Sequence, residues 1–142
     1  MATAAARKIA ARDVAPTTRQ GGEIRVLLSP RTVDATDGFG GTLTLAPGEY
    51  VAEQYHPYSD KFLYLVRGVL ELTVDGEKIR LAADEALMVR RGQRHRFVNP
   101  GGDEALAVFH VSPLAPRPDL GHVDTEPVPN PAGELPRVGG PR

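Results

Sequence analysis

The chain has 142 residues, no cysteine and a formal net charge of −1, which is room for about one domain of typical size. The lack of cysteine excludes disulfides, thiolate zinc sites and cysteine nucleophiles, so any metal needs histidine, carboxylate or amide ligands. The near-zero charge gives no reason to expect binding to nucleic acid or to an anionic membrane. No stretch resembles a signal peptide or a membrane span, so we expect a cytoplasmic protein.

Residues 1–20 have no clear pattern and predict a flexible N-terminal segment. From residue 21 onwards, apolar and polar residues alternate with the two-residue period of half-buried strands. The predicted strands are 23–28, 41–46, 50–56, 62–68, 69–75, 77–82, 85–90, 95–99 and 105–111. Asp75-Gly76 is typical of a tight hairpin turn, because both residues tolerate a positive φ. No later segment has convincing helical periodicity, so the predicted fold class is all-β, a sandwich or barrel.

The C-terminal segment 113–142 is dense in proline and poor in large apolar residues. Proline cannot donate a ladder hydrogen bond, so this tail is expected to be extended coil that can pack along the barrel or a partner subunit. The predicted organisation is therefore one barrel, residues 21–112, between two extended end segments. His122 lies in the tail and is interpreted as structural or exposed.

Three histidines lie in predicted strands and are candidate site residues. Gln54 and His56 are two residues apart, so their side chains leave one strand on the same face, about 7 Å apart along it. His95 opens another strand, and His110 shares its parity with apolar residues, which predicts an inward position. A single strand histidine is usually hydrogen-bonded in the core or lies at the surface, so spacing alone does not bring three together.

Two stretches resemble the sequence motifs of the cupin family. The first motif, G-x5-H-x-H-x3–4-E-x6-G, is matched in spacing by Gly48-x5-Gln54-x-His56-x4-Lys61-x6-Gly68. The second, G-x5-P-x-G-x2-H-x3-N, is matched by Asp84-x5-Arg90-x-Gly92-x2-His95-x3-Asn99. The resemblance implies a cupin double-stranded β-helix, a jelly-roll barrel that holds a metal inside its mouth.

Three further stretches, GGEIRVLLSPRTVDATDGFGGTLTLAPGEYV, HPYSD and VFHVSPLAPRPDLGHVDTE, are similar to a narrower group. They resemble the single-domain cupins of bacterial aromatic polyketide pathways, the tetracenomycin and resistomycin type of cyclase, over roughly residues 20–127. That resemblance implies aldol-type ring closure and aromatisation of a poly-β-keto substrate. It also implies a homodimer and contact with other polyketide synthase components; the alternating apolar residues Phe62, Tyr64 and Val66 are consistent with a second packed surface.

The same resemblance implies a divalent metal, with zinc expected and iron, nickel or manganese as alternatives. Carried over residue by residue, the ligands are Gln54, His56, His95 and His110, and the ion would polarise a carbonyl as a Lewis acid. Gln54 replaces a histidine, but three imidazoles are enough for a catalytic zinc. Lys61 stands at the usual glutamate position, where its charge would repel the ion unless it is neutral or directed at Asp60.

Lys61 and Asp60 are the candidate catalytic side chains, Lys61 as a base whose pKa burial would lower. Shared parity with Lys61, His95 and His110 gives four candidate substrate-binding residues, Leu63, Leu65, Phe97 and Val108. Two alternatives to the metal-dependent cyclase stay open. One is an iron-dependent cupin oxygenase, and the other is a metal-free barrel that binds a polyketide.

Overall fold

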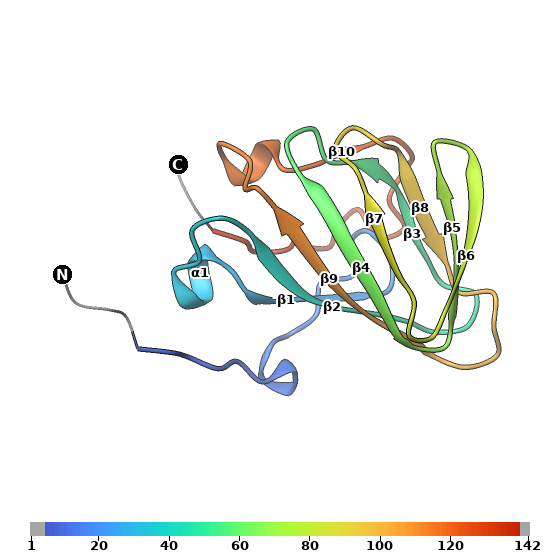
Figure 1. The fold of residues 1–142 in the computed structure, drawn as a ribbon, viewed down its shortest axis with the longest axis horizontal. Helices are drawn as coiled ribbons and strands as arrows, with labels where there is room; N and C mark the ends of the chain where they lie inside the picture. The colour runs from blue at the N-terminus through green and yellow to red at the C-terminus, as the bar shows by residue number, and fades with distance from the viewer. Residues whose placement is uncertain (1–4, 140–142) are drawn as a thin grey trace.

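The computed structural model describes residues 5–139 and contains ten β-strands in two antiparallel five-stranded sheets (Figure 1). The strands are β1 Glu23–Leu28, β2 Phe39–Leu45, β3 Tyr50–Tyr55, β4 Asp60–Arg67, β5 Val69–Val74, β6 Glu77–Ala82, β7 Ala86–Val89, β8 His95–Val98, β9 Ala105–Ser112 and β10 Val123–Asp124. One sheet has the order β1-β2-β9-β4-β7 and the other β10-β3-β8-β5-β6. The predicted all-β jelly roll is confirmed.

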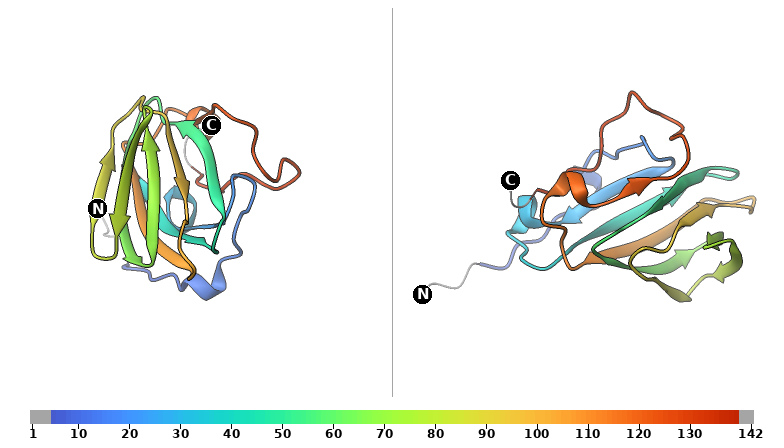
Figure 2. Two further views of the ribbon diagram at one scale, coloured as in Figure 1. Left: turned by 90° about the vertical axis from the view of Figure 1, so that its right-hand side faces the viewer. Right: turned by 90° about the horizontal axis from the view of Figure 1, so that it is seen from above.

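The two sheets face each other and bury the hydrophobic core between them (Figure 2). Leu45, Leu63 and Leu65 come from one sheet, and Leu72 and Phe97 come from the other; none of these side chains is exposed. At about 25 cal/mol for each Å² of apolar surface removed from water, such residues supply the main stabilisation of a barrel of this size. A polar side chain on the inward face of either sheet therefore lies in an apolar interior.

A β-bulge in β3 determines which side chains of the first cupin motif face the interior. The register pairs Val51 with Phe97 and Gln54 with His95, so β3 has one residue more than β8 between these pairs. An extra residue shifts the alternation of side chains by one position. As a result Val51 and Gln54 both face the interior, although they differ in parity, and His56 follows Gln54 inward.

Helical structure is limited to single turns in the described part of the chain. They are η1 Ala11–Asp13, α1 Pro30–Val33 and η2 Pro118–Leu120. The sequence did not predict α1, although its signal is local: Ser29 and Thr32 form a reciprocal capping box and Pro30 occupies the first turn. None of these turns approaches the length and apolarity of a membrane span.

The tail after β9 returns along the barrel and is held at several points. Its strand β10 pairs with β3, placing Asp124 opposite Gln54. Glu126 accepts hydrogen bonds from the Glu53 backbone at 2.7 Å and from the Arg96 guanidinium at 2.9 Å. η2 and β10 lie at the same end of the barrel as the turn that joins β3 to β4 (Figure 1). The proline-rich sequence did not predict β10.

Candidate functional site

The barrel interior opens into a cavity of about 590 Å³. Its walls are mainly apolar, with Val26 and Leu43 from the β1–β2 side and Phe97 and Phe109 from the two sheets. The tail completes the wall through residues in the ranges 114–122 and 135–139. This volume and lining are those of a small-molecule pocket, in which an apolar wall surrounds a few polar groups.

Lys61 carries the most unusual polar group in this cavity. Its side chain is only 8% exposed, and its Nζ lies 5.0 Å from the ring centroid of Phe97 and 5.3 Å from that of Phe109. Among residues 5–139 the Lys61 amine makes no ion pair and no hydrogen bond; the aromatic faces are its partners. Burial lowers the pKa of Lys61 to about 8, because the ammonium form loses its hydration.

His56 and His95 stand together beside this amine. Their rings stack with centroids 5.3 Å apart and planes inclined by 20°. Burial, followed by the charge of Lys61, lowers the pKa of His56 to about 2 and that of His95 to about 4. Both imidazoles are therefore neutral near pH 7, the form that can accept a proton.

The environment of His95 fixes its tautomer. Its Nδ1 lies 3.0 Å from the carbonyl oxygen of Gln93, which can only accept a hydrogen bond, so Nδ1 carries the proton. The other ring nitrogen, Nε2, then presents a lone pair, and this buried atom has no hydrogen-bond partner among residues 5–139. An unsatisfied buried acceptor is costly and usually marks a functional group or a ligand contact.

A second group of hydrogen-bonded polar side chains reaches the cavity from the N-terminal segment and the C-terminal tail. The Gln20 amide donates to Gln54 Oε1 at 2.9 Å and lies 2.9 Å from His122 Nε2. That same nitrogen is 3.2 Å from Asp124 Oδ1, so it accepts from Gln20 when unprotonated and donates to Asp124 when protonated. Sequence reasoning missed Gln20 altogether and interpreted His122 as structural or exposed. The pairing of β10 with β3 brings His122 to the site, and a backbone hydrogen bond from Ala52 in β3 to the Gln20 carbonyl holds Gln20 there.

The predicted inward positions of His110 and Val108 are wrong. β4 and β9 pair so that Lys61 lies opposite Val111 and Phe62 lies opposite His110. Directly opposed residues share a face, so an inward Lys61 requires an inward Val111 and an outward His110. His110 and Val108 are both exposed on the outer face of the sheet. Both faces of β9 are apolar in sequence, so the period-2 pattern did not show which face is buried.

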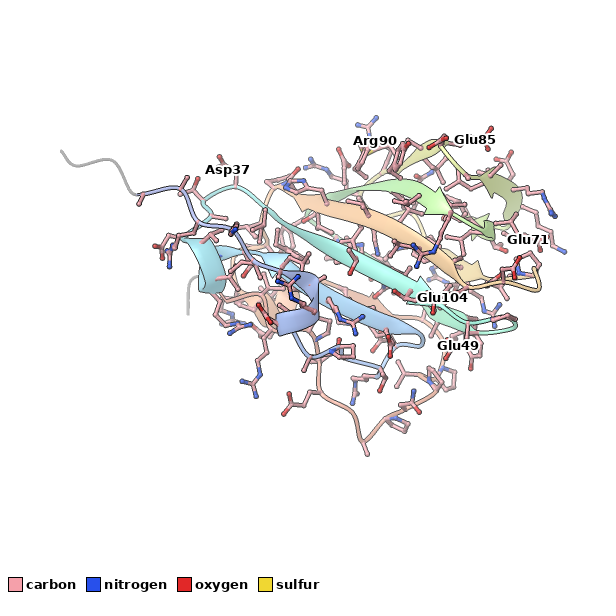
Figure 3. All side chains as sticks on the ribbon, turned by 90° about the horizontal axis from the view of Figure 1, so that it is seen from below. Asp37, Glu49, Glu71, Glu85, Arg90 and Glu104 are labelled. Atoms are coloured by element: carbon pink, nitrogen blue, oxygen red, sulfur yellow. The ribbon has the colours of Figure 1, made fainter. Side chains whose placement is uncertain are left out.

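The remaining predicted residues divide between interior and surface. Phe97 lines the cavity, whereas Leu63 and Leu65 face inward but lie in the fully buried core and do not line the cavity. Asp60 is one residue from Lys61 and faces the other way. Its carboxylate accepts from the Arg91 backbone at 2.9 Å and pairs with the side chain of Arg90, which projects from the outer edge of the molecule (Figure 3).

These contacts remove Asp60 from the predicted catalytic pair. The hydrogen bond from the Arg91 backbone, with the nearby Arg90 and Arg91 charges, lowers the pKa of Asp60. The carboxylate does not line the cavity and makes no ion pair with Lys61. Its role is to join the start of β4 to the loop between β7 and β8.

The residues present do not fit the predicted zinc site. Of the predicted imidazoles only His56 lines the cavity, while His95 is stacked on its ring and His110 faces outward. His122, which was not a predicted ligand, also lines the cavity, but residues 5–139 contain no cluster of three potential histidine, cysteine or carboxylate ligands. The lone pair of His95 suits a metal, but Gln54 Oε1 already accepts from Gln20, and Lys61 replaces the usual carboxylate. An ion here would have no anionic ligand and would face a cation, so we assign no step to one.

Comparison with known proteins agrees with this architecture. Residues 41–112 match the cupin domain family. A double-stranded β-helix protein from Klebsiella pneumoniae has a similar fold, with a TM-score of 0.68 and 20% identity over 86% of this chain and 99% of that one. At this identity the likeness shows the fold alone.

Two curated relatives are much closer in sequence. The Tetracenomycin polyketide synthase protein TcmJ of Streptomyces glaucescens is 63% identical over 96% of this chain and 92% of its own length. Polyketide synthase CurC of Streptomyces cyaneus is 52% identical over 84% of this chain and 78% of its own length. The chain therefore belongs to the cupin family and, within it, to the group of single-domain cupins that includes TcmJ and CurC.

Proposed function

We propose that this protein is a polyketide cyclase that promotes aldol-type ring closure of a poly-β-keto intermediate, with the Lys61 amine as the base. The observation that carries the proposal is a buried amine without an ionic partner among residues 5–139, on the wall of an apolar cavity large enough for a small molecule. The relatives TcmJ and CurC are named as polyketide synthase proteins, which supports the substrate class.

The chemistry needs a base of moderate strength. A methylene between two carbonyls is already acidic, and Lys61, with its pKa lowered to about 8, is partly neutral near physiological pH. When the amine takes a proton it becomes an ammonium beside the enolate that it has formed. Three arginines, Arg31, Arg117 and Arg137, also line the cavity, whereas Asp119 is the acidic residue of the lining. The net positive charge of the cavity therefore favours an anionic intermediate.

Ring closure also needs positioning and proton return. The apolar walls fold the chain and exclude water, which orients one reacting carbon toward a second carbonyl. The Lys61 ammonium can then return its proton to the new alkoxide. During aromatisation the regenerated amine removes a second α-proton and passes it to the departing hydroxyl group, which leaves as water. The neutral imidazole of His56, which lines the cavity, accepts hydrogen bonds from such intermediates, and the ring of His95 is stacked on it.

Substitution of the amine tests the proposal, because the chain has three lysines and the other two, Lys8 and Lys78, are exposed. Lys61→Met is expected to lower the rate of cyclisation by about 10²-fold or more, the usual effect of losing a general base. Lys78→Met is the matched control and should leave the rate unchanged. The measurement is cyclised product formed from a poly-β-keto chain supplied by a polyketide synthase in the same vessel. Equal rates for the two variants would contradict the proposal.

A metal-free barrel that binds a polyketide without catalysis is the second candidate. It is favoured by the donor set, which lacks an anionic ligand, together with the apolar lining of the cavity. In that case the wild-type protein would bind the polyketide and would not accelerate cyclisation over a solution without protein. An iron oxygenase is not favoured, because the acidic residue of the lining, Asp119, lies in the tail and is paired with Arg117 at 3.2 Å.

We also propose that two copies associate through the outer face of the β1-β2-β9-β4-β7 sheet. Phe62, Val66, Met88 and Val108 lie on this face and are between 39% and 49% exposed. Phe62 is directly opposite Met88 across β4 and β7, and Val108 is opposite Tyr64, which lies between Phe62 and Val66 on β4. A connected apolar patch of this kind is typical of an interface.

A further inference from the structure

We infer that Lys61 is a covalent catalyst whose Nζ forms an imine with a carbonyl of a 1,3-dicarbonyl substrate bound in the cavity. The inference rests on the proposed function, since it gives the same amine a second role, as nucleophile as well as base. The first observation that carries it is the position of the amine. Nζ lies between Phe97 of one sheet and Phe109 of the other, at the wall of the cavity and within reach of a bound molecule.

The second observation is that the Lys61 amine has no ionic or hydrogen-bonding partner among residues 5–139. Lysines held for structural reasons are usually paired with a carboxylate, and Lys61 has no such partner in this part of the chain. The neighbouring carboxylate, Asp60, is directed to Arg90 and Arg91 on the outside. The lowered pKa of Lys61 supports the assignment, because only the neutral amine is nucleophilic.

The third observation is a hydrogen-bond acceptor on the wall of the same pocket. Imine formation moves protons from nitrogen to oxygen, and the imidazole of His56 lines the cavity with Lys61, with the ring of His95 stacked on it. The ring of His95 lies 5.4 Å from the ring of Phe97, over which Nζ also lies. The lone pair on His95 Nε2 has no partner in the described part of the chain and can accept a hydrogen bond.

The covalent sequence balances without any further reagent. The Nζ lone pair attacks a ketone carbon, a C–N bond forms, and the carbonyl electrons move to oxygen, which takes a proton to give a carbinolamine. Loss of water and of a nitrogen proton then gives the imine. The adjacent methylene, acidified by the iminium form, loses a proton to give an enamine whose carbon attacks a second carbonyl and forms the ring bond. Water hydrolyses the resulting iminium and restores the amine.

The test uses acetylacetone, a small 1,3-diketone, with the full-length protein. An amine that forms an imine with this probe gives a conjugated enaminone, seen as a new near-ultraviolet band and as a mass increase of one diketone less one water. We expect one adduct per chain, assigned by peptide mapping to Lys61, and the same yield in Lys78→Met. Lys61→Met should show no band, and its circular dichroism and cavity binding of an apolar dye show whether it is folded.

Lys61→Arg separates covalent from electrostatic action, because arginine keeps the positive charge and cannot form the imine. The inference predicts that Lys61→Arg loses both the adduct and the acceleration of cyclisation. An adduct spread evenly over Lys8, Lys61 and Lys78 would overturn it. If no adduct forms while Lys61→Met still abolishes cyclisation, the inference fails and the proposed function stands. If Lys61→Met retains cyclisation, the proposed function fails as well.

Discussion

At the scale of single residues, the site combines three buried basic groups, and each of them costs folding stability. His56 and His95 have their pKa lowered to about 2 and about 4, against 6.5 for an ordinary histidine. Below pH 6.5 the unfolded chain therefore binds protons that the folded chain does not, so acid shifts the equilibrium toward unfolding.

The first prediction concerns this dependence on pH. Between pH 7 and pH 5 each imidazole should reduce the free energy of unfolding by about 2 kcal/mol, because the slope approaches 1.36 kcal/mol for each pH unit below 6.5. Urea unfolding at pH 7 and pH 5 measures the loss. The double variant His56→Gln with His95→Gln lacks both imidazoles. Its free energy of unfolding should therefore fall less over this range, by about the sum of the two imidazole contributions. An equal loss in both proteins would show that the imidazoles are not buried in neutral form.

The second prediction concerns the two departures from the cupin metal motif. Gln54 and Lys61 both face the interior near His56 and His95. Gln54→His together with Lys61→Glu would therefore supply a third imidazole and an anionic ligand in place of a cation. This double variant should bind zinc or cobalt in a stoichiometric amount, whereas the wild-type protein should not, as measured by calorimetry and cobalt absorption spectra. Equal metal binding by the two proteins would contradict the conclusion that Gln54 and Lys61 make the natural site unfit for zinc.

At the scale of elements, the site depends on how strands and tail meet. The sequence predicted the strands 23–28 and 77–82 with the observed bounds, and most others to within one or two residues. Hairpin strands are encoded locally by alternation and turn residues, which explains this success. The bulge in β3 and the inward face of β9 depend on pairing between strands, which cannot be predicted from the sequence of one strand alone.

The same reasoning explains which site residues could be predicted. His56, His95 and Lys61 belong to motifs with fixed spacing, so the sequence placed them correctly in the interior. His110 was misplaced because Phe109 and Val111 make the opposite face of β9 equally apolar. Gln20 and His122 lie far from the motifs in sequence; a backbone hydrogen bond with Ala52 of β3 places Gln20 at the cavity, and the docking of β10 on β3 places His122 there.

The third prediction tests whether the tail completes the cavity. Glu126→Ala removes the acceptor for the Glu53 amide and the Arg96 guanidinium, and the tail should then dissociate more often from β3. We expect faster amide hydrogen exchange in residues 123–126 and weaker binding of a cavity ligand, with little change in the core strands. Glu104→Ala is the matched control, since its partner is the exposed Arg67 and neither residue lines the cavity. Equal exchange in both variants would contradict this role for Glu126.

At the scale of the whole molecule, the two faces of one sheet have separate roles. The inner face carries Lys61 and the cavity, and the outer face carries the apolar patch of Phe62, Val66, Met88 and Val108. The patch draws its members from three neighbouring strands, β4, β7 and β9, rather than from scattered positions on the surface.

The fourth prediction concerns this outer face. Phe62→Glu should halve the mass measured by light scattering, because a buried unpaired carboxylate at an interface is strongly unfavourable. Leu28→Glu is the control, since Leu28 is 48% exposed at the end of β1, on the opposite edge of the same sheet. A wild-type protein that is monomeric at all concentrations would contradict the proposed dimer.

The state of the Lys61 amine is tested most directly by nuclear magnetic resonance. The chain has only three lysines, so a protein labelled with ¹³C at lysine Cε gives three signals that can be followed as the pH is raised. We predict that one signal titrates with a pKa of about 8, that it is missing in Lys61→Met, and that a cavity ligand perturbs it. A Lys61 signal that titrates near the ordinary lysine value of about 10.4 would show that Lys61 is a solvated ammonium, which contradicts its role as a buried base and nucleophile.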